Sequence, residues 1–150
     1  MTAARLRLLV AFVAFAAWVG WLAFQALTEV KAPVLSRAQL LVSTYDIIGT
    51  VTAGPDGRPS ESVMIQEVHW PEQGPLKNGA IIEVINLPEC SGYSGPGEYI
   101  LPLIADDKAD RYRIAPLPPS PGFDTFGHSP PFIYRLMPET RKQLEAIPKR

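Results

Sequence analysis

The hydrophobic positions of this chain follow two different patterns. A run that begins at Leu8 and ends at Leu27 contains no charged residue and a single strongly polar side chain, Gln25. Beyond that run, apolar residues occur in short alternating stretches, and all sixteen prolines lie there, the first being Pro33. The pattern therefore predicts an apolar N-terminal helix followed by a separate domain of ordinary polarity.

The apolar run has the length of a membrane-spanning helix. A helix rises about 1.5 Å per residue, so about 20 apolar residues match a hydrocarbon core about 30 Å thick. Trp18, Trp21 and Phe24 gather near its C-terminal end, where aromatic rings favour the headgroup layer. The sequence thus predicts an uncleaved signal anchor with a transmembrane helix at residues 8–27. The alternative is a cleaved signal peptide, although its apolar region is usually shorter, about 7–15 residues.

Charged residues on the two flanks give the predicted anchor a direction. Arg5 and Arg7 precede the run, and basic residues near a helix end tend to stay cytoplasmic. Residues 1–7 are therefore predicted as a cytoplasmic tail, and the domain as extracytoplasmic, either periplasmic or extracellular. Without these two arginines the chain carries 12 basic and 15 acidic residues, a net charge of −3. Because nucleic acids attract basic surfaces, we expect no nucleic-acid partner.

Five strands are predicted after a linker at residues 28–38. Ser36 can cap a short helix that runs through Leu41. The stretches rich in β-branched and aromatic residues are 45–52, 62–70, 80–87, 98–105 and 111–117, with turn signals such as Gly-Pro-Asp-Gly at 54–57 between them. The alternation within 62–70 changes phase, which predicts a bulge near residues 66–67. Pro102 predicts an edge or a bulge in the fourth strand.

Five short strands without a long helix between them predict a mainly-β domain, a five-stranded OB-like barrel at residues 39–117. A proline-rich extension follows at 118–150 and ends in a short helix at about 138–147. Two overlapping PxxP motifs in residues 116–121 could bind an aromatic groove. We favour a rigid strap over the barrel instead, with contacts through Leu117, Phe123 and Phe126.

The order of these features resembles netrin-like/TIMP-like OB domains. The resemblance rests on Leu-Lys-Asn-Gly at 76–79 before the third strand, a cysteine-bearing loop, and Gly-Glu-Tyr-Ile-Leu at 97–101. It covers about residues 39–115 and implies an OB fold with a tendency towards binding. The chain departs from the pattern because Cys90 is its only cysteine, whereas such domains usually carry disulfides. The N-terminal cysteine through which such inhibitors bind zinc is also absent, so protease inhibition is not implied.

Candidate chemistry is sparse. Glu67 and His69 are two residues apart and could share a metal ion, but Cys90 and His128 lie far away in the sequence. A catalytic thiolate would need an adjacent base, and nothing in the sequence places His69 or His128 beside Cys90. We therefore interpret Glu67 and His69 as solvent-facing positions of an ordinary strand and Cys90 as a packed thiol.

Acidic residues also gather in the turn before the fifth strand. Asp106, Asp107 and Asp110 could bind calcium or serve acid–base chemistry, but a solvated turn between strands has the same composition. The sequence therefore predicts no catalytic, cofactor-binding or metal-binding residue.

The leading functional hypothesis is a membrane-anchored, extracytoplasmic, non-catalytic binding or scaffolding module with an unidentified protein partner. Loops 71–77 and 88–97 are its predicted contact surface. A second hypothesis is an accessory subunit of a membrane complex that it contacts through the helix at 8–27. A third is an enzyme or metal-binding protein that uses Cys90 or His69.

Overall fold

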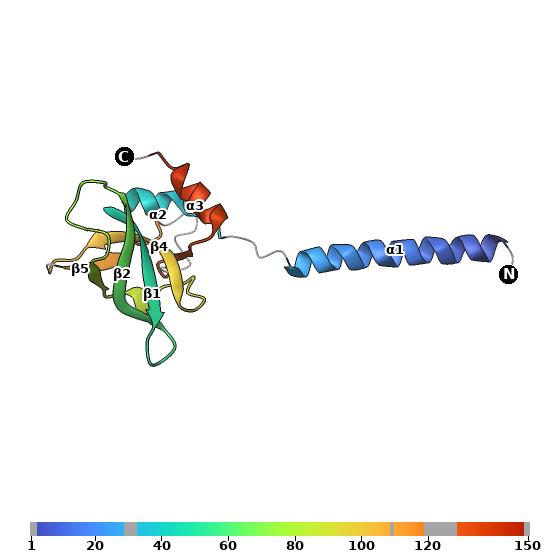
Figure 1. The fold of residues 1–150 in the computed structure, drawn as a ribbon, viewed down its shortest axis with the longest axis horizontal. Coiled ribbons are helices and arrows are strands. Elements are labelled where there is room, and N and C mark those ends of the chain that lie inside the picture. Colours follow the sequence, from blue (N-terminus) through green and yellow to red (C-terminus); the bar gives the residue numbers. More distant parts are fainter. Residues whose placement is uncertain (1–2, 29–32, 109, 119–128, 149–150) are drawn as a thin grey trace. The chain divides into compact units, whose positions relative to one another are not determined.

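The chain divides into two structural units, Met1–Ala32 and Pro33–Arg150. The computed structural model describes residues 3–28, 33–108, 110–118 and 129–148 (Figure 1). The first unit contains helix α1 (Ala3–Thr28). The second contains, in chain order, α2 (Arg37–Val42), β1 (Tyr45–Ala53), β2 (Pro59–Trp70), β3 (Ile81–Val84), the short 3₁₀ helix η1 (Leu87–Glu89), β4 (Gly97–Ala105), β5 (Arg111–Ile114), β6 (Tyr134–Arg135) and α3 (Pro138–Glu145).

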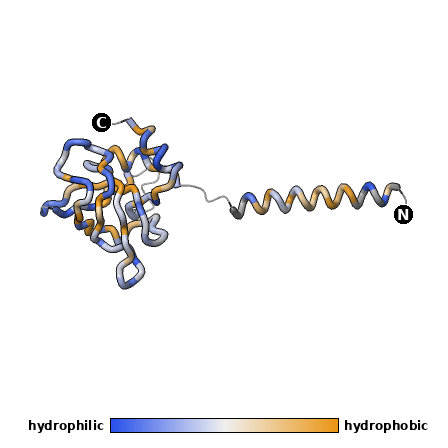
Figure 2. The backbone as a smooth tube through the Cα atoms, viewed as in Figure 1, coloured by the Kyte–Doolittle hydropathy of each residue, from blue (hydrophilic) through white to orange (hydrophobic). Residues whose placement is uncertain are grey.

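Helix α1 is predominantly apolar along its length (Figure 2). Among the residues that the structure describes, no helix combines the length and the apolarity needed to cross a membrane. The predicted transmembrane helix at 8–27 is corrected accordingly. The single-pass location derived from it, with a cytoplasmic N-terminus and an extracytoplasmic domain, is corrected with it.

The five predicted strands form a closed, mixed β-barrel. Strand β1 pairs antiparallel with both β2 and β4, β2 with β3, and β4 with β5, whereas β3 and β5 are parallel. The strands therefore close in the order β1-β2-β3-β5-β4-β1, which confirms the predicted five-stranded barrel. Strand β6 adds a short antiparallel pairing to β4 that the sequence did not predict.

The predicted bulge lies in β2. Ile48 pairs with Glu67 and Gly49 pairs with Ile65, so Gln66 is the extra residue in the ladder. A second irregularity follows at His69, between the pairs at Val68 and Trp70. The extra residue at Gln66 lets Val68 pack against the same barrel core as Val63 and Ile65, although the alternation along the sequence is broken. Trp70, beyond the second irregularity, lies beside Leu40 and Leu144 of the outer cluster instead.

Pro102 is not on an edge strand, because β4 has neighbours on both sides. Its carbonyl accepts a hydrogen bond from the backbone N–H of Ala115 at 2.8 Å. The nitrogen of Pro102, which carries no hydrogen, faces the same side as this carbonyl. On that side the pairing with β5 ends at Leu103 and the pairing with β6 begins at Ile100. The proline thus sits in the gap between two partner strands, where no ladder bond is lost.

Two apolar clusters stabilise this unit. The first fills the barrel and includes Ile65, Val84 and Leu101, each with no exposed surface. The second lies on the outer face of β1 and β4, where Ile48 and Ile100 are covered by residues of α2, β6 and α3. Helices α2 and α3 lie beside each other over this face (Figure 1).

A buried polar network fastens α2 to the C-terminal part of the chain. Gln39 donates to the carbonyls of Ala115 at 2.8 Å and Phe132 at 3.0 Å, and it accepts from the Tyr134 hydroxyl at 2.7 Å. Burial raises the pKa of Tyr134. The predicted cap is confirmed, since the Ser36 side chain accepts from the backbone N–H of Gln39.

Candidate functional site

Cys90 is held as a thiol at the end of η1. Its Sγ donates to the carbonyl of Asn86 at 3.2 Å, and the side chain packs against the barrel core. Burial, followed by the negative charge of Glu89, raises the pKa of Cys90 from the ordinary value of 9.0 to about 12. Because the thiolate is the nucleophilic form, this environment disfavours thiol chemistry at neutral pH.

The other predicted candidates have separate surroundings. Glu67 forms an ion pair with Arg141 of α3. His69 lines a cavity of about 10 Å³ together with Asp46 and Trp70. His128 lies outside the described residues. Within the part of the chain that the structure describes, no group of three or more His, Cys, Asp or Glu residues is arranged to hold a metal ion.

Loop 88–97, one of the two predicted contact loops, packs against residues 131–133 in the C-terminal part of the chain. Ser91 pairs with Phe132 in an isolated parallel bridge, and the Tyr99 hydroxyl donates to the carbonyl of Gly95 at 2.7 Å. Gly92 has a φ of 92°, and a Cβ at this position would lie 2.1 Å from the carbonyl oxygen of Ile133. Only a residue without a side chain fits here, so the loop has a packing role.

A wide depression on the barrel lies beside β2 and β3. It has a volume of about 950 Å³ and is widely open. Its wall and floor are formed by loop 54–56, residues 59–62 of β2, residues 81–83 of β3, Pro88 and Asp110. Of the two predicted contact loops, only Pro88 contributes to it. We call this surface the open face.

The loop between β1 and β2 forms one end of the open face. The backbone N–H of Gly57 donates to the carbonyl of Gly54 at 3.1 Å, which closes the turn that Gly-Pro-Asp-Gly predicts, and the N–H of Gly54 donates to the carbonyl of Arg58 at 2.7 Å. Gly57 has a φ of 76°, in the left-handed region that glycine favours. The Asp56 carboxylate accepts from the backbone N–H of Arg58 at 3.2 Å, so the turn fixes the position of this side chain.

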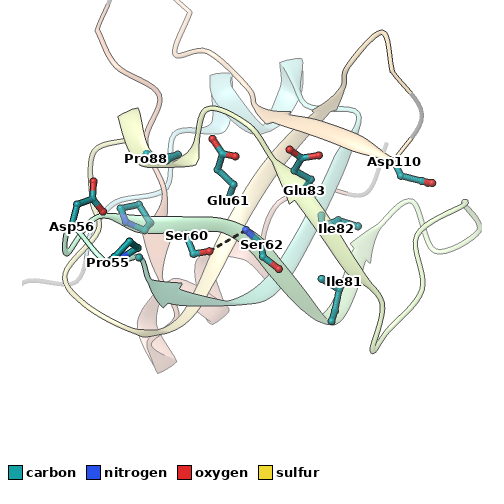
Figure 3. A pocket seen from close by; sticks show the side chains of 12 residues that line it. Pro55, Asp56, Ser60, Glu61, Ser62, Ile81, Ile82, Glu83, Pro88 and Asp110 are labelled. Atoms are coloured by element: carbon teal, nitrogen blue, oxygen red, sulfur yellow. Dashed lines mark hydrogen bonds between the residues drawn. The ribbon is translucent and has the colours of Figure 1, made fainter.

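Four carboxylates line the open face and come from different elements (Figure 3). Asp56 and Asp110 lie at its two ends, and Glu61 and Glu83 lie between them from neighbouring strands (Figure 3). The carboxylates are therefore spread along the depression and do not converge on one point.

Two of these carboxylates have arginine partners. Glu83 makes two hydrogen bonds with Arg111, at 2.9 and 3.0 Å, and these bonds together with its charge raise the pKa of Arg111. Asp56 lies 3.7 Å from Arg58 in an exposed pair. Glu61 and Asp110 are not within salt-bridge distance of a cation among the described residues, although the charge of Glu61 also helps to raise the pKa of Arg111. The open face thus keeps an excess of negative charge.

Exposed apolar surface accompanies this charge. Ile81 of β3 is 71% exposed, and Met64, directly opposite it on β2, is 43% exposed. Pro55 and Pro88 add further apolar surface to the walls. The open face therefore offers both carboxylates and apolar contacts to a ligand.

Comparisons with protein-family models, with curated proteins and with solved structures give no match for this chain. The class that the fold and the site define is a five-stranded mixed β-barrel with an open, acidic depression beside β2 and β3. The resemblance to netrin-like/TIMP-like domains stays a prediction.

Proposed function

We propose that this protein is a non-catalytic binding module whose contact surface is the open face. The observation that carries the proposal is the depression of about 950 Å³ beside β2 and β3, bounded by the loops that follow β1 and β4. Five-stranded barrels of the OB type use this side, with the corresponding two loops, to bind extended ligands. The position of the depression therefore favours ligand binding over a purely structural role.

The exposed residues of the open face support the same proposal. An apolar surface framed by polar residues is typical of an interaction site. Ile81 is the exposed apolar residue of the open face, and Met64 pairs with it on β2 outside the lining. The carboxylates of Glu61 and Glu83 line the same depression. Burial of apolar area contributes roughly 25 cal/mol per Å², so covering Ile81 alone would add usefully to the affinity of a ligand.

The non-catalytic part of the proposal rests on the candidate chemical groups. Cys90 has a pKa of about 12 and packs against the core. Glu67 is engaged by Arg141, and the carboxylates of the open face are spread along it. None of these arrangements joins a nucleophile to a base at hydrogen-bonding distance, as acid–base or covalent catalysis requires.

A selection from a peptide library of all charge classes, displayed on phage and presented with the full chain, tests the proposal. We expect enriched peptides whose affinity falls about tenfold in Ile81→Ala, since burying an isoleucine side chain is worth about 1.5–3 kcal/mol. Val42→Ala is the matched control, because Val42 is an exposed apolar residue of α2 that does not line the open face. Enrichment of no peptide, or unchanged affinity in Ile81→Ala, would contradict the proposal.

A further inference from the structure

We infer that the open face binds a basic, extended peptide segment of a partner protein. This inference rests on the proposed function and adds the chemical class of the ligand. It follows from charge complementarity. The depression presents four carboxylates, of which two have arginine partners at salt-bridge distance.

The spacing of the carboxylates favours a ligand with several separated cations. A metal ion needs ligands that converge within about 2–2.6 Å of one point. Here Asp56 and Asp110 stand at opposite ends, and the described residues contain no cluster suited to a metal (Figure 3). Lysine or arginine side chains along an extended peptide can reach separated carboxylates, whereas a single ion cannot.

The available charge lies mainly on two of the four residues. Glu83 is held by two hydrogen bonds from Arg111, so its carboxylate is largely neutralised. Glu61 and Asp110 are exposed and have no cation within salt-bridge distance among the described residues; Glu61 interacts with Arg111 only at longer range. The pair of Asp56 and Arg58 is exposed too, and such pairs contribute about 0–1 kcal/mol, so an incoming cation can compete for Asp56.

The apolar part of the open face favours a peptide over a simple amine. Ile81, Pro55 and Pro88 offer contacts for aliphatic side chains and for the methylene stems of lysine and arginine. Nucleic acid is disfavoured by the same surface, because protein–nucleic acid affinity depends on basic groups that neutralise phosphates. OB-type barrels bind oligonucleotides on the corresponding side. In this protein that side is negatively charged, which suits a basic ligand and not a nucleic acid.

Fluorescence polarisation with the full chain and synthetic probes tests the inference. The probe is a labelled twelve-residue peptide of lysine, proline and valine, with matched peptides in which glutamine or glutamate replaces every lysine. A single-stranded oligothymidylate is a fourth probe. We expect the lysine peptide to bind at least tenfold more tightly than the glutamine peptide, and the glutamate peptide and the oligonucleotide not to bind. Raising the salt from 0.1 to 1 M should weaken binding, since the Debye length falls from about 10 to 3 Å.

Two variants place the interaction on the open face. Glu61→Gln and Asp110→Asn should each weaken lysine-peptide binding about two- to fivefold, and together about tenfold, as expected for exposed charge pairs. Asparagine tolerates the left-handed backbone of Asp110, whose φ is 62°. Glu139→Gln, which removes an exposed carboxylate of α3 outside the open face, is the matched control and should leave binding unchanged.

The outcomes separate the inference from the proposed function. Equal affinity for the glutamine peptide, competition by the oligonucleotide, or unchanged binding in the Glu61→Gln, Asp110→Asn double variant would overturn the inference. If the library selection still yields peptides that depend on Ile81 but carry no basic residues, the binding module stands and only its ligand class is wrong. If nothing depends on Ile81, the proposed function itself fails.

Discussion

The outer surface of the barrel has two contrasting faces. On β1 and β4, Ile48 and Ile100 point outward but are 2% and 0% exposed, because α2, β6 and α3 cover them. On β2 and β3, Met64 and Ile81 also lie on the outer side, and they are 43% and 71% exposed. Similar strand residues therefore have opposite surroundings on the two faces.

The contrast separates stability from binding. The covered face is fixed by an apolar cluster and by the three hydrogen bonds of Gln39, which tie α2 to the C-terminal part of the chain. The open face lacks such a cover among the described residues and carries carboxylates around an exposed isoleucine. We therefore expect substitutions on the first face to change the free energy of unfolding, and substitutions on the second to change ligand affinity.

The largest effect is expected for Ile100→Ala on the covered face. Removing a fully buried isoleucine side chain leaves a cavity and should lower the free energy of unfolding by about 3 kcal/mol, within a range of about 2–5 kcal/mol. Urea unfolding followed by circular dichroism measures it. A loss below about 1 kcal/mol would mean that the covering helices collapse into the space, or that they cover this face only loosely.

Gln39→Leu should have the next largest effect. The substitution roughly keeps the volume but leaves the carbonyls of Ala115 and Phe132 without their donor. The Tyr134 hydroxyl loses the acceptor for its proton, although it still accepts from the backbone N–H of Ser36 at 3.1 Å. An unsatisfied buried polar group costs about 1–3 kcal/mol, so we expect a loss of at least about 2 kcal/mol in the free energy of unfolding.

A double-mutant cycle with Tyr134→Phe checks this explanation. Gln39→Leu leaves the Tyr134 hydroxyl without an acceptor, and Tyr134→Phe removes that hydroxyl. Tyr134→Phe should therefore lower the free energy of unfolding less in the Gln39→Leu variant than in the wild type. Strict additivity of the two losses would show that the hydrogen bond between these side chains does not contribute to the covered face.

The sequence predicted the barrel because its strands carry strong local signals. β-branched and aromatic stretches, the Gly-Pro-Asp-Gly turn and the change of phase in β2 each depend on residues close together in the chain. The bulge at Gln66 and the cap at Ser36 were found for the same reason. Local hydrogen bonding and side-chain alternation are sufficient for these features.

Features that depend on distant partners were missed. Strand β6 has two residues, too few for an alternation pattern, and exists through its pairing with Tyr99 and Ile100. The central strand β4 accommodates Pro102 only because its neighbours β5 and β6 leave a gap beside this residue. The open face could not be located either, because the sequence does not state which outer face of a barrel the terminal segments cover.

A pH-dependent effect on stability is expected at Cys90, which packs against the barrel core. Its pKa is raised to about 12 in the folded chain, so the folded state keeps the proton while the unfolded thiol loses it above its ordinary value of 9.0. The stabilisation is therefore complete below pH 9 and is lost as the pH rises towards 12. Between pH 8 and pH 10 we expect a loss of about 1 kcal/mol, allowing for the partial exposure of the side chain.

Cys90→Ala supplies the control for this effect. The variant should be less stable than the wild type at pH 8 but should lose less stability between pH 8 and pH 10, as measured by urea unfolding in both buffers. Parallel pH profiles of the two proteins would show that other groups, such as Tyr112, whose pKa is raised mainly by burial, cause the dependence.

The smallest effect on stability is expected for Ile81→Ala, and it is the most informative one. Ile81 is 71% exposed, so its truncation should change the free energy of unfolding by no more than about 0.5 kcal/mol. The same substitution at Ile100 removes the same atoms and should cost about six times as much, because only there are the atoms buried. The affinity for the selected peptides should show the reverse order: Ile81→Ala should lower it about tenfold, and Ile100→Ala should change it less. A marked loss of stability in Ile81→Ala would instead mean that the exposed face is covered in solution, for example by a second copy of the chain, and that the contrast between the two faces does not hold.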